Sequence, residues 1–380
     1  MPDKILFLKQ GSFSLTNDSV FRILDTEFAN FQIDVIDAND VQKKNFKYYH
    51  YLKNIFFFIR EYGKDFVLGY KPPRSVLAWF LSTSYISRLT TKYVQKEIKS
   101  NDYRFTFQTQ SIFNGKKGGI PHFVYTDHTT KTNLYYPNIN PRLYIRSDKF
   151  IEQCESKVYN DADMIFTFGS SITYSLLNQY NIPREKVETV YAGINISDNY
   201  LENPSKYFSK KILFVGVEWE RKGGPLLLKA FEKVLVKHPD ASLTIVGCSP
   251  KNITLPNCQV VGRVTADKVA DYYNNAAIFC LPTLREPFGI VFVEAMRYKL
   301  PVLSSNIGSI PDMVVNNYNG FLIDNSVEEY TDKICMLLDN PALGKEWGEN
   351  GFKYGQSKFT WEIAGKKMKE TITNFIDIVR

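Results

Sequence analysis

The chain has 380 residues and a formal net charge of +7, and 44% of its residues are hydrophobic against 23% charged. Because these fractions are ordinary for a globular protein and the length suffices for two hydrophobic cores, they exclude a disordered chain and predict two domains. The five cysteines have no paired spacing, so neither a disulfide framework nor a metal site is indicated.

The chain runs from Met1 almost directly into an apolar run at residues 5–8, which leaves no room for a signal peptide. The longest apolar run, at residues 75–87, is too short and too polar to span a bilayer. We therefore expect a cytoplasmic protein with reduced thiols.

Short apolar runs alternate with longer segments through the first half of the chain. They lie at residues 4–8, 32–36, 105–108, 123–125, 164–168 and 188–191. Short strands separated by helices predict a parallel sheet covered on both faces, and hence an α/β fold. The polar stretch at residues 197–209, which contains Pro204, is the expected linker.

Charge is distributed unevenly along the chain. Residues 43–149 hold 19 lysines and arginines against 6 acidic residues. The same stretch is rich in aromatic residues, namely Tyr48, Tyr49, Tyr51, Phe56, Phe57, Phe58, Trp79 and Phe80. This mixture suits an anionic membrane surface, where each cation contributes about 1 kcal/mol, but a solvated basic face over an aromatic core explains it equally well. No nucleic-acid-binding motif accompanies the charge, so we expect no nucleic acid partner.

A polar segment follows the expected strand at residues 123–125. In open α/β folds, ligands bind beyond the carboxyl ends of the parallel strands. Asp127 and His128 lie at such a position and are therefore candidate site residues. The alternative is a polar cluster that simply caps the end of the strand.

The second half repeats the pattern of short apolar runs. They lie at residues 211–215, 243–246, 260–261, 278–281, 302–304 and 321–323. The last residues, 361–380, have the periodicity of an amphipathic helix, with Ile363, Met368, Ile372 and Phe375 on one face. That periodicity indicates only that one face of the helix is buried.

Residues 285–296 carry the strongest functional signal in the chain. They read R-E-P-F-G-I-V-F-V-E-A-M, so a Pro-Phe-Gly turn connects an apolar strand to an apolar helix. The first backbone N–H groups of a helix lack partners within the helix and attract phosphate. We expect the N–H groups of Ile290 and Val291, which follow Gly289, to bind a phosphate in this way.

Two glutamates bracket this turn. Glu294 lies on the first turns of the expected helix, where its carboxylate is placed to accept hydrogen bonds from ribose hydroxyls. Glu286 precedes the helix, beside the reacting end of a bound ligand. The simpler alternatives are a helix N-terminal acid for Glu294 and a turn-stabilising carboxylate for Glu286.

The two glutamates, seven residues apart around Pro-Phe-Gly, resemble the signature of retaining glycosyltransferases of the GT-B fold, of the glycosyl transferases group 1 or family 4 type. Further blocks of that family pattern occur in order on both sides. These include Phe214-Val215-Gly216, Arg221-Lys222-Gly223-Gly224, Leu243-Thr244-Ile245-Val246-Gly247, Val261-Gly262-Arg263-Val264, Gly308-Ser309-Ile310-Pro311 and Asn319-Gly320-Phe321-Leu322-Ile323. The ordered set is far more specific than any single block.

The resemblance implies two facing Rossmann-like domains with a cleft between them. Residues 1–200 would form the acceptor-binding domain and residues 207–360 the nucleotide-sugar-binding domain. Residues 361–380 would form a helix that crosses back to the first domain.

The resemblance also implies roles for residues of the second domain. Lys222 stands where the family has a lysine for the donor phosphate. The arginine that usually follows the first glycine block is replaced by Val217, and Arg221 is the candidate to supply the missing cation. Arg263 and Val264 are expected beside the base, through their main-chain atoms.

In the first domain, the resemblance places His128 against the transferred sugar. Asp127 is expected to orient the acceptor hydroxyl or His128. Gly11 lies in a shortened glycine loop and is expected near the diphosphate.

Breaking the bond between a sugar and a diphosphate increases the negative charge of the phosphate, so catalysis needs cations and N–H donors aimed at it. No D-x-D pair occurs in a suitable loop, which agrees with transfer that needs no metal or other cofactor. The expected function is retaining transfer of a hexose from a UDP- or GDP-linked donor to a hydroxyl of a glycan or lipid-linked acceptor, as in polysaccharide biosynthesis, peripheral to an anionic membrane. The alternatives are a nucleotide-sugar 2-epimerase of the same fold and a non-catalytic nucleotide-sugar-binding protein.

Overall fold

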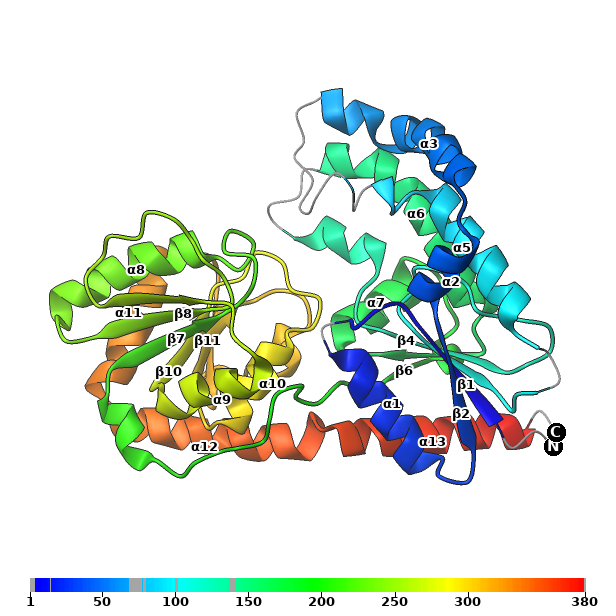
Figure 1. Cartoon of the computed structure of the whole chain (residues 1–380). Coiled ribbons are helices and arrows are strands. Elements are labelled where there is room, and N and C mark those ends of the chain that lie inside the picture. Colours follow the sequence, from blue (N-terminus) through cyan, green and yellow to red (C-terminus); the bar gives the residue numbers. More distant parts are fainter. Residues whose placement is uncertain are drawn as a thin grey trace. The chain divides into compact units, whose positions relative to one another are not determined.

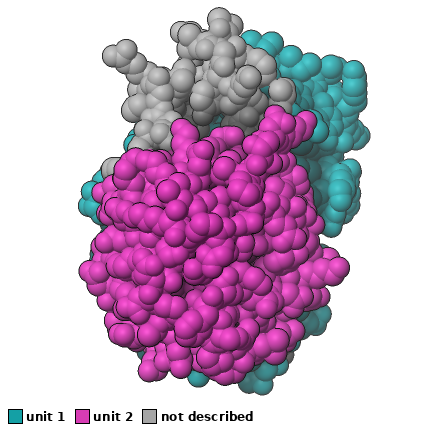
Figure 2. All heavy atoms as spheres, turned by 90° about the vertical axis from the view of Figure 1, so that its left-hand side faces the viewer, with its two compact units in different colours: residues 1–190, 365–380 teal, residues 191–364 magenta. Residues whose placement is uncertain are grey.

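The computed structural model describes residues 4–13, 15–67, 77, 80–99, 102–136 and 141–378, with the backbone alone at 64–67, 135 and 141–148. The chain divides into two compact units, coloured separately in Figure 2. Unit 1 comprises Met1–Val190 and Gly365–Arg380, and unit 2 comprises Tyr191–Ala364. The division lies before the boundary that the sequence predicts at residue 200.

Unit 1 is built on a six-stranded sheet in which every neighbouring pair of strands is parallel. Its strands are β1 (Lys4–Lys9), β2 (Gln32–Asp37), β3 (Thr106–Thr109), β4 (His122–Thr126), β5 (Met164–Thr167) and β6 (Val187–Thr189). Their order across the sheet is β2-β1-β3-β4-β5-β6. The central strands β3 and β4 are buried along their whole length, which explains why they read as apolar runs.

Helices connect these parallel strands (Figure 1). They are α1 (Thr16–Glu27), α2 (Ala38–Asn45), α3 (Tyr48–Val67), α5 (Ser84–Glu97), α6 (Pro141–Asp161) and α7 (Ser170–Asn178), with the 3-10 helices η1 (Thr130–Tyr135) and η2 (Arg184–Lys186). Aromatic rings fill much of the core between helices and sheet. Phe107 stacks on Phe166 with ring centroids 6.1 Å apart, and Tyr125 stacks on Phe168 at 4.1 Å. Trp79 and part of the stretch at 75–87 lie outside the described residues.

Unit 2 repeats this architecture with a second six-stranded parallel sheet. Its strands are β7 (Lys211–Val215), β8 (Ser242–Val246), β9 (Cys258–Gly262), β10 (Ile278–Leu281), β11 (Val302–Ser305) and β12 (Gly320–Ile323), in the order β12-β11-β10-β7-β8-β9. Its helices are α8 (Gly224–Lys237), α9 (Ala266–Asn275), α10 (Ile290–Arg297), α11 (Val327–Asp339) and α12 (Pro341–Lys358), with the 3-10 helices η3 (Pro204–Phe208) and η4 (Ile310–Asp312). The α/β prediction and the expected strands of both halves are confirmed.

The last helix, α13 (Trp361–Ile378), begins in unit 2 and continues into unit 1, where residues 365–378 belong. Its fully buried line is Ala364, Met368, Ile372 and Ile376, four residues apart. Of the face predicted from the sequence, Ile363 and Phe375 are only half-buried, although the Phe375 ring lies 5.7 Å from that of Phe123.

The segment expected to be a polar linker, residues 197–209, is instead packed onto unit 2. The ammonium of Lys206 donates to the carbonyl of Tyr298 at 2.5 Å, and the Tyr207 hydroxyl donates to the carbonyl of Lys299 at 2.7 Å. Lys206 is buried, which lowers its pKa to about 7. A polar sequence does not reveal which of its side chains find such partners, so this packing was not predicted.

Among the described residues, no helix combines the length and the apolar character that crossing a bilayer requires.

Candidate functional site

The turn before α10 has the conformation that the sequence predicts. Gly289 precedes the helix with a φ of +95°, and a Cβ atom at this position would lie 2.5 Å from the Phe292 side chain. Phe292 is in turn fixed by Phe279 of β10, with ring centroids 5.8 Å apart. Glycine is required here because the left-handed backbone and the ring of Phe292 leave no room for a side chain. The helix consequently begins at Ile290, so its first turn, which includes Val291, follows β10 at the carboxyl edge of the sheet.

Lys222 and Glu286 form a buried ion pair ahead of this helix. Their side chains are only 8% and 7% exposed, and the Lys222 ammonium donates to the Glu286 carboxylate. Burial lowers the pKa of Lys222, and the negative charge of Glu286 opposes that shift. Because a buried charge is costly without its partner, Glu286 stabilises the charged form of Lys222.

Parallel topology explains why these two residues, 64 positions apart, meet. Lys222 follows β7 and Glu286 follows β10, and β7 and β10 are neighbours in the sheet. The carboxyl ends of parallel strands lie at one edge, so the loops after these strands are adjacent. Arg263 and Val264 follow β9 at the same edge, where Arg263 is exposed and Val264 half-buried.

Hydrogen bonds join the two loops. The N–H of Leu284 donates to the carbonyl of Arg221 at 2.8 Å, and the Arg221 guanidinium donates to the carbonyl of Arg285 at 2.6 Å. The Arg221 guanidinium is also paired with Glu218, while Val217 is 57% exposed. The positive charge of Arg221 therefore lies at the site but is neutralised by Glu218 in this structure.

Glu294 lies on α10 with its carboxylate buried. Its Oε2 accepts a hydrogen bond from the Tyr273 hydroxyl at 3.1 Å. Burial raises the pKa of Glu294 to about 7, while the bonds from Tyr273 and the Asn195 backbone and the charge of Lys222 oppose the rise. The group predicted to accept hydrogen bonds from ribose is thus already partnered inside unit 2.

The candidates of unit 1 follow β1 and β4. His128 is half-buried; its Nδ1 lies 3.0 Å from the Thr132 hydroxyl oxygen, and its carbonyl accepts hydrogen bonds from Thr126 at 2.8 Å and Tyr159 at 3.2 Å. Asp127 is half-buried beside it. His122, in contrast, is a core residue at the start of β4, where burial lowers its pKa to about 3.

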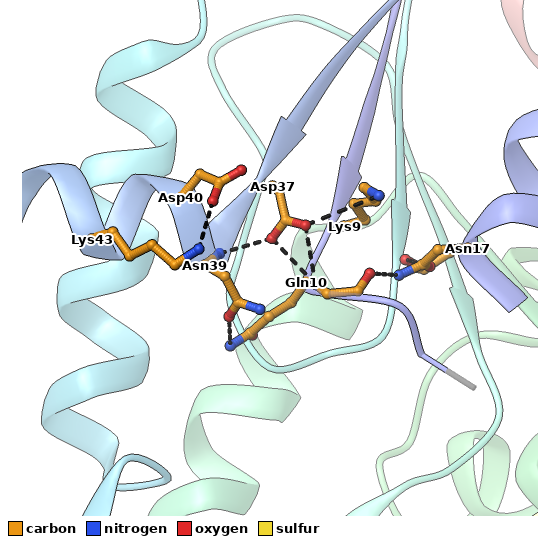
Figure 3. Close-up of polar contacts among 9 residues, drawn as sticks. Lys9, Gln10, Asn17, Asp37, Asn39, Asp40 and Lys43 are labelled. Atoms are coloured by element: carbon orange, nitrogen blue, oxygen red, sulfur yellow. Dashed lines mark hydrogen bonds and ion pairs between the residues drawn. The ribbon is translucent and has the colours of Figure 1, made fainter. Parts of the chain in front are cut away.

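Gly11, two residues after the end of β1, has a φ of +63°. Its N–H donates to both carboxylate oxygens of Asp37 at 3.2 Å, and its carbonyl accepts from Asn17 at 2.6 Å. Asp37 also accepts from the Asn39 N–H at 2.9 Å and lies 4.0 Å from the Lys9 ammonium (Figure 3). The amide expected near the diphosphate is therefore used to fix the turn between β1 and α1.

A buried carboxylate that the sequence does not single out supports the loop of His128. Glu155 on α6 accepts hydrogen bonds from the Ser111 hydroxyl, the Thr130 N–H and the Tyr159 hydroxyl, each at 2.8 Å, and from Tyr180. These donors come from four separate segments of unit 1. No local sequence pattern predicts such a cluster, because its members meet only in the folded chain.

Residues 202–354, which contain the whole of this unit 2 site, match the family model of the glycosyl transferases group 1. The chain is 29% identical over 189 residues to an uncharacterized glycosyltransferase of Methanocaldococcus jannaschii, covering 47% of this chain and 51% of that protein. It is 25% identical over 224 residues to the capsular polysaccharide biosynthesis glycosyltransferase CapM of Staphylococcus aureus, covering 56% and 55%. The matched part thus spans about half the length of these relatives.

Solved structures resemble the whole chain. A sucrose-phosphate synthase of Thermosynechococcus elongatus has a TM-score of 0.70 at 14% identity, covering 99% of this chain and 100% of that one. Anabaena HepE in complex with UDP and glucose has a TM-score of 0.62 at 14% identity, covering 97% and 99%. These matches show that the chain has the GT-B fold.

Proposed function

We propose that the protein is a glycosyltransferase that moves a hexose from a nucleotide diphosphate sugar to a hydroxyl group, with retention at the anomeric carbon and without a metal ion. The observation that carries this proposal is the buried Lys222–Glu286 pair beside the start of α10. The pair lies within the segment that matches the glycosyl transferases group 1. The glycosyltransferases among the curated relatives support the same reaction class.

In the proposed reaction, the bond between the anomeric carbon and the diphosphate oxygen breaks, and its electron pair stays on that oxygen. The acceptor oxygen forms a new bond to the same face of the carbon, and its proton passes to the released diphosphate. Negative charge grows on the diphosphate as the bond breaks. The Lys222 ammonium and the N–H groups of Ile290 and Val291 are the proposed donors that stabilise this charge. Because Lys222 is buried, its charge is weakly screened by water.

Glu286 has two proposed tasks. It keeps Lys222 protonated, and its carboxylate accepts hydrogen bonds from sugar hydroxyls. Glu294 is proposed to contact the ribose once the donor replaces its present partner Tyr273. Arg263 and Val264 remain the proposed contacts of the base.

The candidate residues of unit 1 are proposed to contact the sugar and the acceptor. His128 is proposed to contact the transferred sugar, Asp127 to orient the acceptor hydroxyl, and Gly11 to approach the diphosphate. The acceptor is proposed to be a glycan or a lipid-linked sugar, since CapM is a glycosyltransferase of capsular polysaccharide biosynthesis. UDP is the favoured nucleotide, since Anabaena HepE of the same fold binds UDP and glucose.

A donor screen tests the proposal. The protein is mixed with UDP-, GDP- and ADP-sugars in the presence of EDTA, and both thermal stability and release of the nucleoside diphosphate are measured. We expect one donor to raise the melting temperature and to be turned over with EDTA present. NMR of the product should show an unchanged anomeric configuration. Among the described residues no cluster of three His, Cys, Asp or Glu side chains is placed to hold a metal ion, but only the EDTA arm tests metal independence.

Variants of the buried pair connect this activity to the site. Lys222→Met or Glu286→Gln alone leaves the other charge buried and unpaired, which costs about 3–5 kcal/mol. The double variant Lys222→Met/Glu286→Gln removes both charges, and we expect it to recover most of that stability while transfer stays lost. The matched control is Lys233→Met/Glu328→Gln, which removes an exposed pair of unit 2.

Full transfer activity in the folded double variant would contradict the proposal. So would conversion of the donor to its 2-epimer without an acceptor, or donor binding without turnover when a broad set of glycan and lipid-linked acceptors is supplied.

A further inference from the structure

Helix α3 (Tyr48–Val67) buries three polar side chains against the rest of unit 1. His50, Asn54 and Glu61 are each at most 6% exposed. The His50 Nδ1 lies 2.9 Å from the Tyr85 hydroxyl, and Glu61 accepts a hydrogen bond from the Ser84 N–H at 2.8 Å. Asn54 donates to the carbonyl of residue 80 at 2.5 Å. The buried face of this helix is thus anchored by hydrogen bonds to the segment at residues 80–85.

The opposite face of α3 is apolar and exposed. Tyr48 is 77% exposed, Leu52 49%, Ile55 45%, Phe56 64% and Ile59 63%. Their spacing of three and four residues places them in one stripe along the helix. A helix of a globular protein normally buries its apolar stripe, so an exposed one that faces away from the core indicates an interaction surface.

The charges around the stripe identify its partner. Lys47, Lys53 and Arg60 are exposed beside it. Between residues 47 and 63 the acidic side chain is Glu61, which is buried, hydrogen-bonded to Ser84 and 3.6 Å from the Arg60 guanidinium, whose side chain stays 40% exposed. The exposed charges of this part of α3 are therefore all positive. An apolar stripe with a cationic border is the pattern of a helix that lies in the interface of an anionic bilayer.

We propose that the outer face of α3 is a membrane-docking surface, which inserts its apolar stripe between the headgroups of anionic lipids while the three cations contact the headgroup phosphates. This surface is distinct from the unit 2 site, and the proposal stands without the proposed transfer reaction. It commits to a lipid surface rather than to a second copy of the chain, because two such faces would bring their cations against each other.

Co-sedimentation with vesicles tests the proposal. The full chain is mixed with vesicles of phosphatidylcholine alone or with phosphatidylglycerol added. We expect binding to the mixed vesicles that weakens as salt is raised. The variant Leu52→Ser/Phe56→Ser/Ile59→Ser should reduce the partition coefficient by about tenfold or more. The variant Lys47→Gln/Lys53→Gln/Arg60→Gln should remove the preference for phosphatidylglycerol.

The matched control carries three serines at exposed apolar positions of unit 2, namely Leu201, Phe208 and Val236, which are 63%, 72% and 82% exposed. We expect this control to bind vesicles like the unaltered protein. Equal loss in the control and in the α3 variant, or unchanged binding in the α3 variant, would overturn the proposal. Circular dichroism and the donor-induced thermal shift verify that each variant is folded, so that failure of docking and failure of the transfer proposal are told apart.

Light scattering tests the alternative that a second copy of the chain covers the stripe. If the serine variant of α3 changes the oligomeric state and leaves vesicle binding intact, the stripe is a contact between copies of the chain and the proposal is wrong. A tryptophan at position 56, introduced as Phe56→Trp, should be quenched by brominated lipids, whereas Phe208→Trp in the control region should not.

Discussion

At the scale of single residues, Glu294 makes stability depend on pH. Burial raises its pKa from 4.5 to about 7, so the folded state holds this proton more tightly than the unfolded state. The resulting stability is fully present below about pH 4.5 and is lost as the pH rises to about 7. The variant Glu294→Gln is neutral throughout, and we expect it to gain roughly 3 kcal/mol relative to the unaltered protein between pH 4.5 and pH 8.

Urea unfolding at pH 5 and pH 8 measures this difference. An exposed glutamate of α8 supplies the control, Glu232→Gln, which should leave the free energy of unfolding unchanged at both values. The same offset between Glu294→Gln and the unaltered protein at both pH values would contradict the prediction.

Glu155 is a second buried carboxylate, and it acts as a positioning residue for the loop of His128. Glu155→Ala leaves the Ser111 hydroxyl and the Thr130 N–H without their acceptor, whereas the Tyr159 hydroxyl keeps the His128 carbonyl. Because each unsatisfied buried donor costs about 1–3 kcal/mol, we expect a loss of about 3–5 kcal/mol in the free energy of unfolding. Chemical denaturation measures the loss, and Glu155→Gln should recover part of it.

The control for this prediction lies one turn earlier on α6. Glu152 pairs with Lys131 at 2.9 Å but is 34% exposed, so Glu152→Ala should cost at most about 1 kcal/mol. If the proposed role of His128 is right, Glu155→Gln should also lower the transfer rate while the donor-induced thermal shift stays the same. A loss no larger than that of Glu152→Ala would contradict the positioning role.

At the scale of elements, a glycine fixes the join between β7 and α8. Gly223 has a φ of +73°, and a Cβ atom there would lie 1.7 Å from the carbonyl oxygen of Pro282, which is backbone and has little freedom to move. Gly223→Ala should therefore lower the free energy of unfolding by about 2–4 kcal/mol. Gly119 is the matched control, since no heavy atom lies within 4 Å of a Cβ there, and Gly119→Ala should be nearly neutral.

Differential scanning calorimetry of the two variants provides the measurement. Similar melting temperatures for Gly223→Ala and Gly119→Ala would show that the loop before α8 can move away from Pro282. The donor-induced thermal shift should be weakened in Gly223→Ala alone, because the neighbouring Lys222 is displaced with the loop.

The strands and turns of both units show which features of the fold can be predicted from the sequence. Buried parallel strands are apolar along their length, so the strands of both sheets were predictable to within a few residues. Lys222 and Glu286 were each predicted to belong to the donor site, but their ion pair was not, because it depends on β7 and β10 being neighbours in the sheet. The turn at Gly289 was predictable because Pro-Phe-Gly is a turn sequence and glycine adopts the positive φ that this turn requires.

The remaining features depend on contacts that no local pattern contains. Asp37 fixes Gly11 across 26 positions of the chain, and the Glu155 donors Ser111 and Thr130 come from segments outside α6. The exposed stripe of α3 has the periodicity of any amphipathic helix, which does not tell whether the apolar face or the polar face is buried. The packing of residues 197–209 on unit 2 was hidden for the same reason.

At the scale of the whole molecule, the proposed roles of the two units predict which unit each part of the donor protects from hydrogen exchange. A ligand present at 100 times its dissociation constant adds about 2.7 kcal/mol to the stability of the state that binds it. If unit 2 holds the nucleotide, UDP alone should slow hydrogen exchange at residues 216–224 and 286–294. The complete nucleotide sugar should extend the protection to the His128 loop of unit 1, because the sugar is the part that His128 is proposed to contact.

Hydrogen–deuterium exchange with mass spectrometry, with and without each ligand, separates these two steps. Lys222→Met/Glu286→Gln should lose the protection of unit 2 with both ligands, whereas His128→Ala should lose only the part that the sugar adds. If UDP alone protects unit 1 first, the proposal has assigned the nucleotide to the wrong unit. That result would place the diphosphate on the turn of Gly11, where its N–H would have to exchange Asp37 for the ligand.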